Sequence, residues 1–253
     1  IEKLKKKTEM ECFKRILATA IIALLSTASI AQITSGKIIY ERRTNLKKTV
    51  GDNPRASRFI TDENKIRKEN FELAFNETSS VFEFIENDEV EEGGMMKMLT
   101  QRNKVYQNLE DEEFFMIMNS WGQEMLLKDS LSERTWKITE NKRKFAGHMC
   151  RKAIWEQNDS TRIYAWFSPD IVPSIGPEGF YGLPGAILGL ATENGSIVYF
   201  ATEIKEEEVD KAKMDYSEYK KDIFTKEELI ITLVKGMGQW IKREKLEAMF
   251  SWY

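Results

Sequence analysis

Many short segments of the chain alternate apolar and polar residues or are rich in β-branched and aromatic residues, and short polar turns separate several of them. In the segment 80–86, Phe82 and Phe84 alternate with glutamate, the period of two that is typical of a half-buried strand. Gaps this short permit antiparallel neighbours but leave no room for crossover helices. We therefore expect a mainly β fold with one antiparallel sheet over residues 36–204. The predicted strands are 36–44, 80–86, 103–109, 133–139, 146–156, 161–167, 186–193 and 196–204.

The C-terminal region has a different pattern, that of a helix. Thr225 is followed three positions later by Glu228, which is a capping-box sequence. Gly236 and Gly238 interrupt the region, and each costs about 1 kcal/mol relative to alanine. The pattern predicts a C-terminal helix from 226 to about 235. The apolar residues that recur at helical spacing are Ile230, Leu233, Val234, Met237 and Ile241.

The first 31 residues have the features of a secretory signal peptide in the right order. Lys14 and Arg15 precede the uncharged stretch ILATAIIALL, and Ser29 and Ala31 stand at the positions that a signal peptidase reads. The apolar stretch is too short to span a bilayer. We expect cleavage before Gln32 and a single mature domain over 32–253, in the periplasm or outside the cell. The alternative for this stretch is a buried N-terminal helix.

The start of translation and the charge of the mature chain also follow from these residues. Met10 begins a better-proportioned signal, so residues 1–9 are interpreted as an upstream extension that is not translated. Residues 32–253 contain 32 basic and 38 acidic residues, a net charge of −6. This balance argues against a nucleic-acid partner, which requires a basic footprint. We find no further segment that is long and apolar enough to be transmembrane.

The stretch 182–185 (Gly-Leu-Pro-Gly) lies inside an otherwise apolar run, where a strand of the core would avoid proline. Proline followed by glycine fits a type II turn, because Pro184 presets φ and Gly185 supplies the positive φ. The backbone is therefore expected to bend sharply here. We assign structural roles to the four residues of this motif, which are Gly182, Leu183, Pro184 and Gly185.

A second glycine signal follows in the same region. Asn194-Gly195 is the strongest two-residue hairpin signal. When strand pairing is continued from this turn, Gly189 lies opposite Phe200. A glycine beneath an aromatic ring is a known packing device in sheets. We therefore expect Gly189 to be structural, with Phe200 covering it.

The stretch GLPGAI at 182–187 resembles the motif that names the GLPGLI family of secreted proteins from Gram-negative bacteria, with Ala186 in place of the usual leucine. The resemblance extends upstream through HMCRKA (148–153), AWFSPDI (165–171) and SIGPEGF (174–180). The family has no established activity. A related module at the N-terminus of some bacterial peptide:N-glycosidases forms a bowl of antiparallel strands. The resemblance thus implies a curved sheet, as a bowl or half-barrel.

Few residues of the chain suggest catalysis or metal binding. His148 is the only histidine, and with Cys150 it puts two possible ligands on one face of a strand. Two ligands do not close a tetrahedral zinc site, so a packed histidine beside a buried thiol is expected and no metal or cofactor is assigned. There is no G-x-S-x-G, phosphate-loop or dinucleotide sequence. Carboxylates are abundant, so a glycosidase-like pair stays open, and no catalytic residue is assigned.

Aromatic residues gather near the family motif, and they provide the candidate binding site. On a concave sheet such rings could stack on a sugar or hold an apolar tail, whereas the alternative is an ordinary aromatic core. We take Trp166, Phe180 and Tyr181 as candidate binding residues.

The expected function is that of an exported cell-envelope protein that binds a glycan, a lipid or another envelope protein without catalysis. Two alternatives stay open. One is a glycan-acting envelope hydrolase whose carboxylates are not located, and the other is a purely structural envelope subunit.

Overall fold

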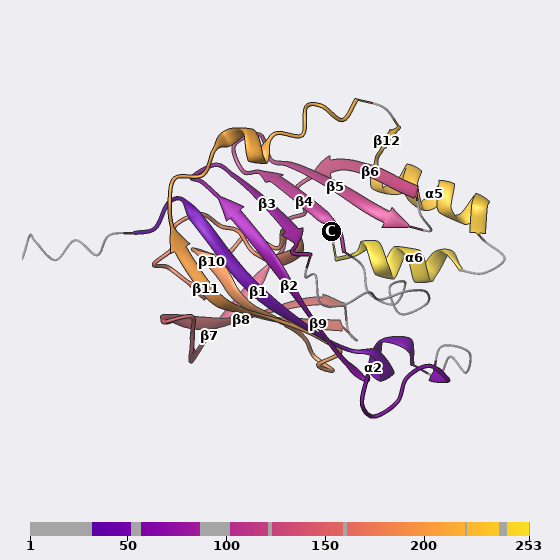
Figure 1. The fold of residues 1–253 in the computed structure, drawn as a ribbon, viewed down its shortest axis with the longest axis horizontal. Coiled ribbons are helices and arrows are strands. Elements are labelled where there is room, and N and C mark those ends of the chain that lie inside the picture. The colour runs from indigo at the N-terminus through magenta and orange to yellow at the C-terminus, as the bar shows by residue number, and fades with distance from the viewer. Residues whose placement is uncertain are drawn as a thin grey trace, which may run out of the picture. The chain divides into compact units, whose positions relative to one another are not determined.

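One sheet of twelve strands organises the described chain, in the order β12-β6-β5-β4-β3-β2-β1-β11-β10-β9-β8-β7 (Figure 1). The structure is a computed structural model that describes residues 32–51, 57–86, 102–120, 123–158, 161–220, 222–237 and 242–252. The sheet belongs to the unit Ile33–Tyr253. The predicted signal peptide at 1–31 lies outside the described residues.

The bounds of the elements are as follows. The strands are β1 (Gly36–Asn45), β2 (Ile66–Phe75), β3 (Ser79–Phe84), β4 (Lys104–Asn108), β5 (Glu113–Ser120), β6 (Gln123–Ser130), β7 (Trp136–Phe145), β8 (His148–Asn158), β9 (Thr161–Ser168), β10 (Ala186–Thr192), β11 (Ile197–Glu206) and β12 (Ile223–Phe224). The helices are α2 (Leu46–Val50), α5 (Lys226–Met237) and α6 (Arg243–Phe250), with 3₁₀ turns η1 (Pro177–Gly179) and η2 (Lys211–Met214).

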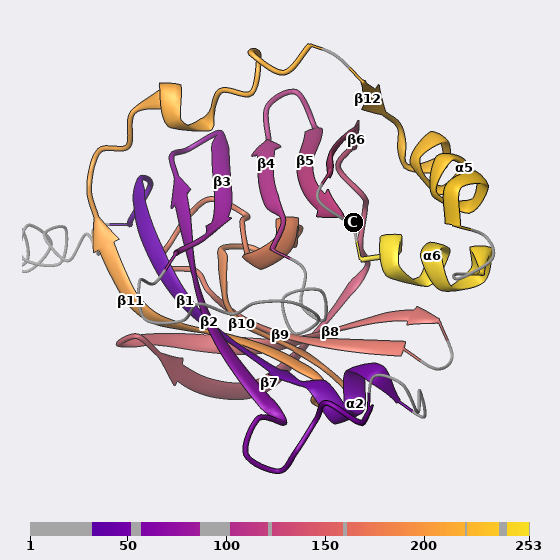
Figure 2. The same ribbon diagram turned by 45° about the vertical axis from the view of Figure 1, so that its right-hand side comes forward.

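The predicted mainly β, antiparallel fold is confirmed. Each predicted strand overlaps a strand of the sheet, whereas β2, β5, β6 and β12 were not predicted. The chain forms two meanders, β1 to β6 and β7 to β11, and β11 joins them by pairing antiparallel with β1. The two-residue strand β12 pairs parallel with β6. The sheet is open, and it curves so that the two meanders lie on opposite sides of the loop that carries η1 (Figure 2).

The inner face of this curve contains the core. In β1, burial alternates with every second residue, and the buried members of the series are Ile38, Tyr40, Arg42 and Thr44. The matching positions of β2 and β3 add Phe71, Leu73 and Phe82 to the same cluster. The period of two therefore places one face of β1 in the core, and β2 adds to the same side. It also buries the charged side chain of Arg42 among aromatic rings.

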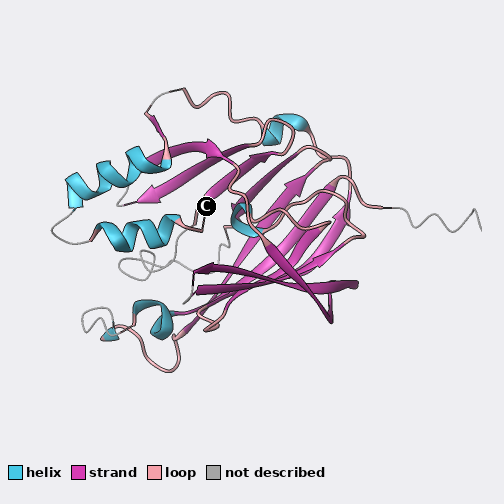
Figure 3. Ribbon diagram, turned by 180° about the vertical axis from the view of Figure 1, so that it is seen from behind, coloured by secondary structure: helices cyan, strands magenta, loops and turns pink. Residues whose placement is uncertain are grey.

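The C-terminal helix begins as predicted. The backbone N–H of Thr225 donates to Glu228 Oε2 at 2.8 Å, and the N–H of Glu228 donates to Thr225 Oγ1 at 3.3 Å, which is the capping box. Helix α5 runs to Met237, and a second helix, α6, was not predicted. The two helices lie side by side next to β6 (Figure 3). Gly238 and Ile241 lie outside the described residues.

The bend at Pro184 differs in type from the expected type II turn. The N–H of Gly185 donates to Leu183 C=O at 2.8 Å, a bond over two residues that defines a γ-turn. The N–H of Ala186 cannot close a type II turn because it donates to Ile171 C=O instead. Gly185 has φ of +132°, and a Cβ atom there would lie 2.1 Å from Ser168 O. Both the conformation and the close approach thus require glycine.

Gly189 pairs with Phe200 as predicted, but the ring that covers it is a different one. A Cβ atom on Gly189 would lie 2.9 Å from Cζ of Phe145, the last residue of β7. Strand β7 comes close to β11 although three strands separate them in the sheet order. The expectation that Phe200 covers Gly189 is therefore wrong, because the β7–β8 hairpin reaches over this part of the sheet.

We predict that Gly185→Val destabilises the protein by more than about 1 kcal/mol, because a β-branched residue would be forced to a positive φ beside Ser168. Thermal denaturation followed by circular dichroism measures the change. The matched control is Gly236→Ala in α5, where a new Cβ meets nothing within 4 Å. This control should raise stability by up to about 1 kcal/mol. An unchanged melting temperature for Gly185→Val would contradict the assigned bend.

Candidate functional site

The loop between β9 and β10 carries Glu178 into the inner face of the sheet. Glu178 has φ of 54° and ψ of 25°, a left-handed conformation that residues with a side chain rarely adopt. The residue is only 3% exposed. Its Oε1 accepts a hydrogen bond from Tyr199 Oη at 2.6 Å and lies 3.6 Å from Arg42 Nη1. These contacts fasten the loop to β11 and β1.

Arg42 is the centre of a buried charged cluster. Its Nε and Nη2 atoms donate to Glu69 Oε2 at 3.2 and 2.6 Å, and its guanidinium carbon lies 4.5 Å from the centre of the Phe71 ring. The second oxygen of Glu69 lies 2.8 Å from Arg102 Nε and 3.1 Å from Arg67 Nε. We call Arg42, Arg67, Glu69, Arg102, Glu178 and Tyr199 the charged cluster.

The electrostatics of the charged cluster favour the ionised form of Glu69. Burial by itself would raise the pKa of Glu69, but the neighbouring arginines outweigh it and hold the pKa below its usual range. Burial likewise acts to lower the pKa of Arg42, and Tyr199, Glu69 and Glu178 together raise it. A catalytic general acid requires a carboxyl with a raised pKa, so Glu69 has the opposite property.

The next residues of the loop enter an aromatic cluster, which consists of Trp136, Trp155, Phe180 and Trp252. Phe180 is 0% exposed, and its ring centre lies 5.6 Å from Trp252, 6.1 Å from Trp155 and 6.4 Å from Trp136. A ligand cannot stack on a ring that is enclosed on all sides. The candidate binding residue Phe180 is therefore enclosed, and in this cluster it packs as core, which was the alternative for these aromatic residues.

Arg134 and Tyr181 line the border of the aromatic cluster. The guanidinium carbon of Arg134 lies 4.5 Å from the Phe180 ring centre and 5.8 Å from that of Tyr181, and its Nη2 donates to Trp252 C=O at 2.7 Å. Burial lowers the pKa of Arg134 to about 10. Tyr181 is half-buried, and its C=O accepts from Trp136 Nε1 at 3.0 Å. These bonds tie the C-terminal residues to the loop, so Tyr181 is partly used in packing.

Trp166 lies apart from Phe180, on the opposite face of the sheet. It pairs with Gly189 on β10 and with Lys152 on β8, and its ring centre lies 5.9 Å from Phe145. Lys152 Nζ lies 4.0 Å from the ring centre of Tyr164 and 5.8 Å from that of Trp166. Lys152, Tyr164 and Trp166 are all half-buried. We call these three residues the outer aromatic site, since they keep partial exposure on a fixed strand surface.

His148 and Cys150 do not form a catalytic pair. His148 Nδ1 lies 3.0 Å from Asp170 Oδ2, and both side chains are partly exposed. Cys150 is fully buried, and burial raises the pKa of its thiol to about 12. The nearby Ser168 is also buried, and its Oγ accepts the N–H of Asp170. The imidazole therefore has a carboxylate partner, whereas the thiol is protonated and enclosed at neutral pH.

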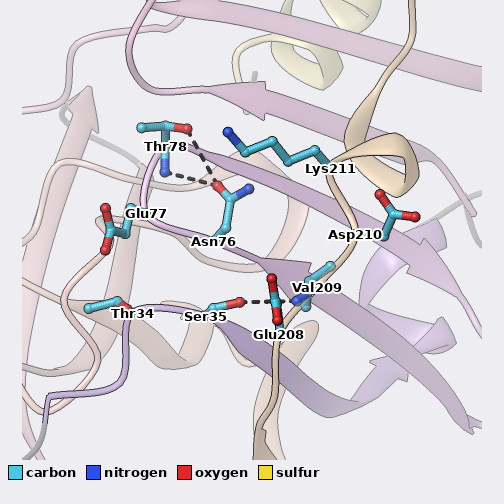
Figure 4. Close-up of a pocket in the computed structure, with 9 residues that line it drawn as sticks. All are labelled: Thr34, Ser35, Asn76, Glu77, Thr78, Glu208, Val209, Asp210 and Lys211. Carbon is cyan, nitrogen blue, oxygen red and sulfur yellow. Dashed lines mark hydrogen bonds between the residues drawn. The ribbon is translucent and has the colours of Figure 1, made fainter.

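A groove of about 730 Å³ lies beside the start of β1 and the ends of β2 and β11 (Figure 4). Several of its polar atoms already have partners. Ser35 Oγ contacts Phe75 O, Glu207 O and the N–H of Val209, and Asn76 Oδ1 accepts the N–H of Thr78. These bonds hold the loops together, so we assign the groove no ligand. The lining residues are Thr34, Ser35, Asn76, Glu77, Thr78, Glu208, Val209, Asp210 and Lys211.

The described residues were also compared with the requirements of a metal site and of a membrane-spanning helix. Within the described ranges, histidine, cysteine, aspartate and glutamate side chains do not gather in groups of three or more that could hold a metal ion. No described helix is long and apolar enough to cross a membrane.

The sequence pointed to Trp166, Phe180 and Tyr181 but missed the charged cluster and Lys152. The buried Arg67 and Glu69 of β2 look like solvent-facing positions, so the sequence offers no signal for them. The sequence does contain a signal for Lys152. The predicted strand 146–156 places it on the same face as His148 and Cys150, which were already candidates. Its pairing with Trp166 depends on the register between β8 and β9.

Comparisons with known proteins find a family model that is similar to part of the chain. Residues 130–189 match the model of a family described as a protein of unknown function (Porph_ging). The matched stretch contains β7, β8, β9, η1 and the Gly-Leu-Pro-Gly motif. A search of the curated proteins found no match.

The solved structures that match this chain have low sequence identity to it. PNGF-II in two crystal forms is 17% and 16% identical, with a TM-score of 0.49 in both cases. The alignment covers 76% of this chain and 31% of the PNGF-II chain, so the chain spans about a third of PNGF-II. An uncharacterized conserved protein from Thermus thermophilus is 10% identical with a TM-score of 0.39, covering 81% of this chain and 99% of the other.

We predict that Arg42→Met destabilises the protein by about 3–5 kcal/mol, because it leaves buried carboxylates without their central cation. Equilibrium unfolding in urea at pH 7 measures the loss. The stability that Glu69 contributes is present above the pKa of an unfolded glutamate, about 4.3, and is lost as the pH falls through its lower folded pKa. The wild type should therefore lose stability below about pH 4.

The control for this prediction is the neighbouring residue. Arg43 is 48% exposed at its side chain and pairs with Glu41 on the surface. Arg43→Met removes the same charge, and its cost should stay below about 1 kcal/mol. Equal losses for the two variants would show that the charged cluster does not hold the fold together.

Proposed function

We propose that the protein is an exported cell-envelope protein of the GLPGLI type that binds a glycan, a lipid or another envelope protein without catalysing a reaction. The order of charge, apolar stretch and small residues at 14–31 supports export. The motif GLPGAI, which lies within the stretch matched by the family model, supports the family assignment. The outer aromatic site carries the binding part of the proposal.

The outer aromatic site has the properties that a ligand surface needs. Its two aromatic rings are partly exposed and offer apolar area with a defined orientation. Lys152 adds a positive charge within about 6 Å of both ring centres, the range of a cation–π contact. Backbone pairing among β8, β9 and β10 fixes the strands that present these side chains. A surface that is ordered before binding loses less entropy when a ligand arrives.

The chemistry of the buried groups supports binding rather than hydrolysis. A glycosidase of the two-carboxylate type uses one carboxyl group with a raised pKa. Glu69 has a lowered pKa, and Glu178 is enclosed by Tyr199 and Arg42. The thiol of Cys150 is enclosed and protonated, which removes it as a nucleophile.

The export part of the proposal predicts a defined N-terminus. Protein recovered from the periplasm or the medium should begin at Gln32, because Ser29 and Ala31 direct the peptidase to that bond. Intact-mass analysis of the recovered protein measures this. Recovered protein that keeps residues 13–31 would contradict export through this signal.

The binding part predicts that Trp166→Ala weakens binding to fractionated envelope glycans or lipids about tenfold, a loss of about 1.4 kcal/mol. The matched control is Phe180→Leu in the aromatic core, which should lower the melting temperature and leave the affinity of the folded protein unchanged. The same assays follow turnover by product analysis. Turnover that a single carboxylate substitution abolishes would favour the hydrolase. Failure of the folded protein to bind any fraction would favour the structural subunit.

A further inference from the structure

The β7–β8 hairpin concentrates positive charge in an acidic protein. Residues 136–152 contain six lysines and arginines and one glutamate, whereas the whole chain has a net charge of −3. The whole hairpin, residues 136–158, also contains Glu156 and has a net charge of +4 with histidine neutral. Its basic residues are Lys137, Lys142, Arg143, Lys144, Arg151 and Lys152.

Most of these charges have no acidic partner among the described residues. Among the described residues, Arg151 is the one hairpin cation with a carboxylate within ion-pair distance, at 3.5 Å from Glu140. Many surface cations outside the hairpin have an acidic partner. Examples are Lys37 with Glu207, Lys104 with Glu83, Lys128 with Glu113 and Lys213 with Glu72. The positive field of the hairpin is thus not neutralised locally.

The unpaired cations project from both faces of the hairpin. Lys142, Arg143 and Lys144 are consecutive in β7, so their side chains point alternately to opposite faces. Lys144 lies opposite Met149, which is 52% exposed. On the other face, Arg143 lies 5.0 Å from the ring centre of Phe145, which contacts Trp166. The basic surface is therefore continuous with the outer aromatic site.

We propose that the β7–β8 hairpin binds an acidic polysaccharide, a sugar chain that bears carboxylate, phosphate or sulfate groups. A flat membrane would meet one face of the hairpin, whereas a flexible chain reaches cations on both faces. Because β7 is the outermost strand of the sheet order, no neighbouring strand blocks its free edge among the described residues. The inference rests on the proposed function, since it names the chemical class of the envelope ligand.

A purely structural role for the same charges makes a different prediction. Lysines on an edge strand protect a sheet against pairing with another sheet edge. In that case the hairpin would bind no polymer, and removing its charges would lead to self-association. The two roles are separated by measuring ligand binding and the oligomeric state of the same variants.

The test uses the full chain and a variant with Lys142→Gln, Arg143→Gln and Lys144→Gln together. These three side chains are exposed, so the melting temperature should not change. The matched control carries Lys47→Gln, Lys65→Gln and Lys205→Gln, which removes the same charge from residues that have acidic partners; Lys47 and Lys205 are exposed and Lys65 is half-buried. Binding is measured to polygalacturonate, dextran sulfate, neutral dextran, phosphatidylglycerol vesicles and single-stranded poly(dT).

We expect the wild type to bind the two acidic polysaccharides more tightly than neutral dextran, and to lose affinity as salt is raised, because salt screens exposed charges. The hairpin variant should bind them at least tenfold more weakly, and the control should stay within about twofold of the wild type, since a 1.4 kcal/mol change is tenfold in affinity.

Three results would overturn the inference. One is equal weakening in both variants, which would reflect net charge alone. Another is tighter binding to vesicles or to poly(dT) than to the acidic polysaccharides. The third is self-association of the hairpin variant without polymer binding by the wild type. If the hairpin variant keeps its affinity for an envelope fraction that Trp166→Ala loses, this inference fails while the proposed function stands.

Discussion

The contact of Glu178 with Tyr199 and Arg42 fixes the loop between β9 and β10, and much of the interior depends on that loop. A left-handed residue with a side chain costs roughly 1–2 kcal/mol, and a buried carboxylate costs more unless it is paired. Both costs are offset only when the Glu178 carboxylate contacts Tyr199 and Arg42. Phe180 follows two residues later and fills the aromatic cluster, where Trp252 packs on it. One ion pair thereby connects the sheet, the loop and the C-terminal residues.

The same burial of charge explains what the sequence could not predict about the fold. Strand β3 is visible because apolar and polar residues alternate in its sequence, where Glu83 stands between Phe82 and Phe84. In β2 the burial alternates as well, but two of the buried positions are Arg67 and Glu69. A pattern of polarity assigns these residues to solvent, so the period of two disappears at that end of the strand. Their partners come from β1 and from residue 102, contacts that the local sequence does not contain.

Contacts between distant strands limit prediction of the candidate site in a similar way. The Asn194-Gly195 turn fixed the pairing of Gly189 with Phe200, because a hairpin register depends on local residues. That Phe145 covers Gly189 depends on how β7 and β8 reach over the sheet. Trp166 and Phe180 were equivalent candidates by residue type and by position near the motif. The inserted loop decides between them, since it carries Phe180 into the core and leaves Trp166 on the opposite face.

Charged side chains are paired in the interior and mostly unpaired on the β7–β8 hairpin, and this difference bears on how a ligand would approach. On the inner face the charges of the cluster are paired and enclosed. On the β7–β8 hairpin most of the cations lack a carboxylate among the described residues, although residues 32–253 have a net charge of −6. Charges separated by more than about 8 Å are largely screened at physiological ionic strength. Carboxylates farther away than this do not cancel the field at the hairpin, so a polyanion would be attracted there although the net charge is negative. Net charge describes the average surface, whereas recognition depends on the local one.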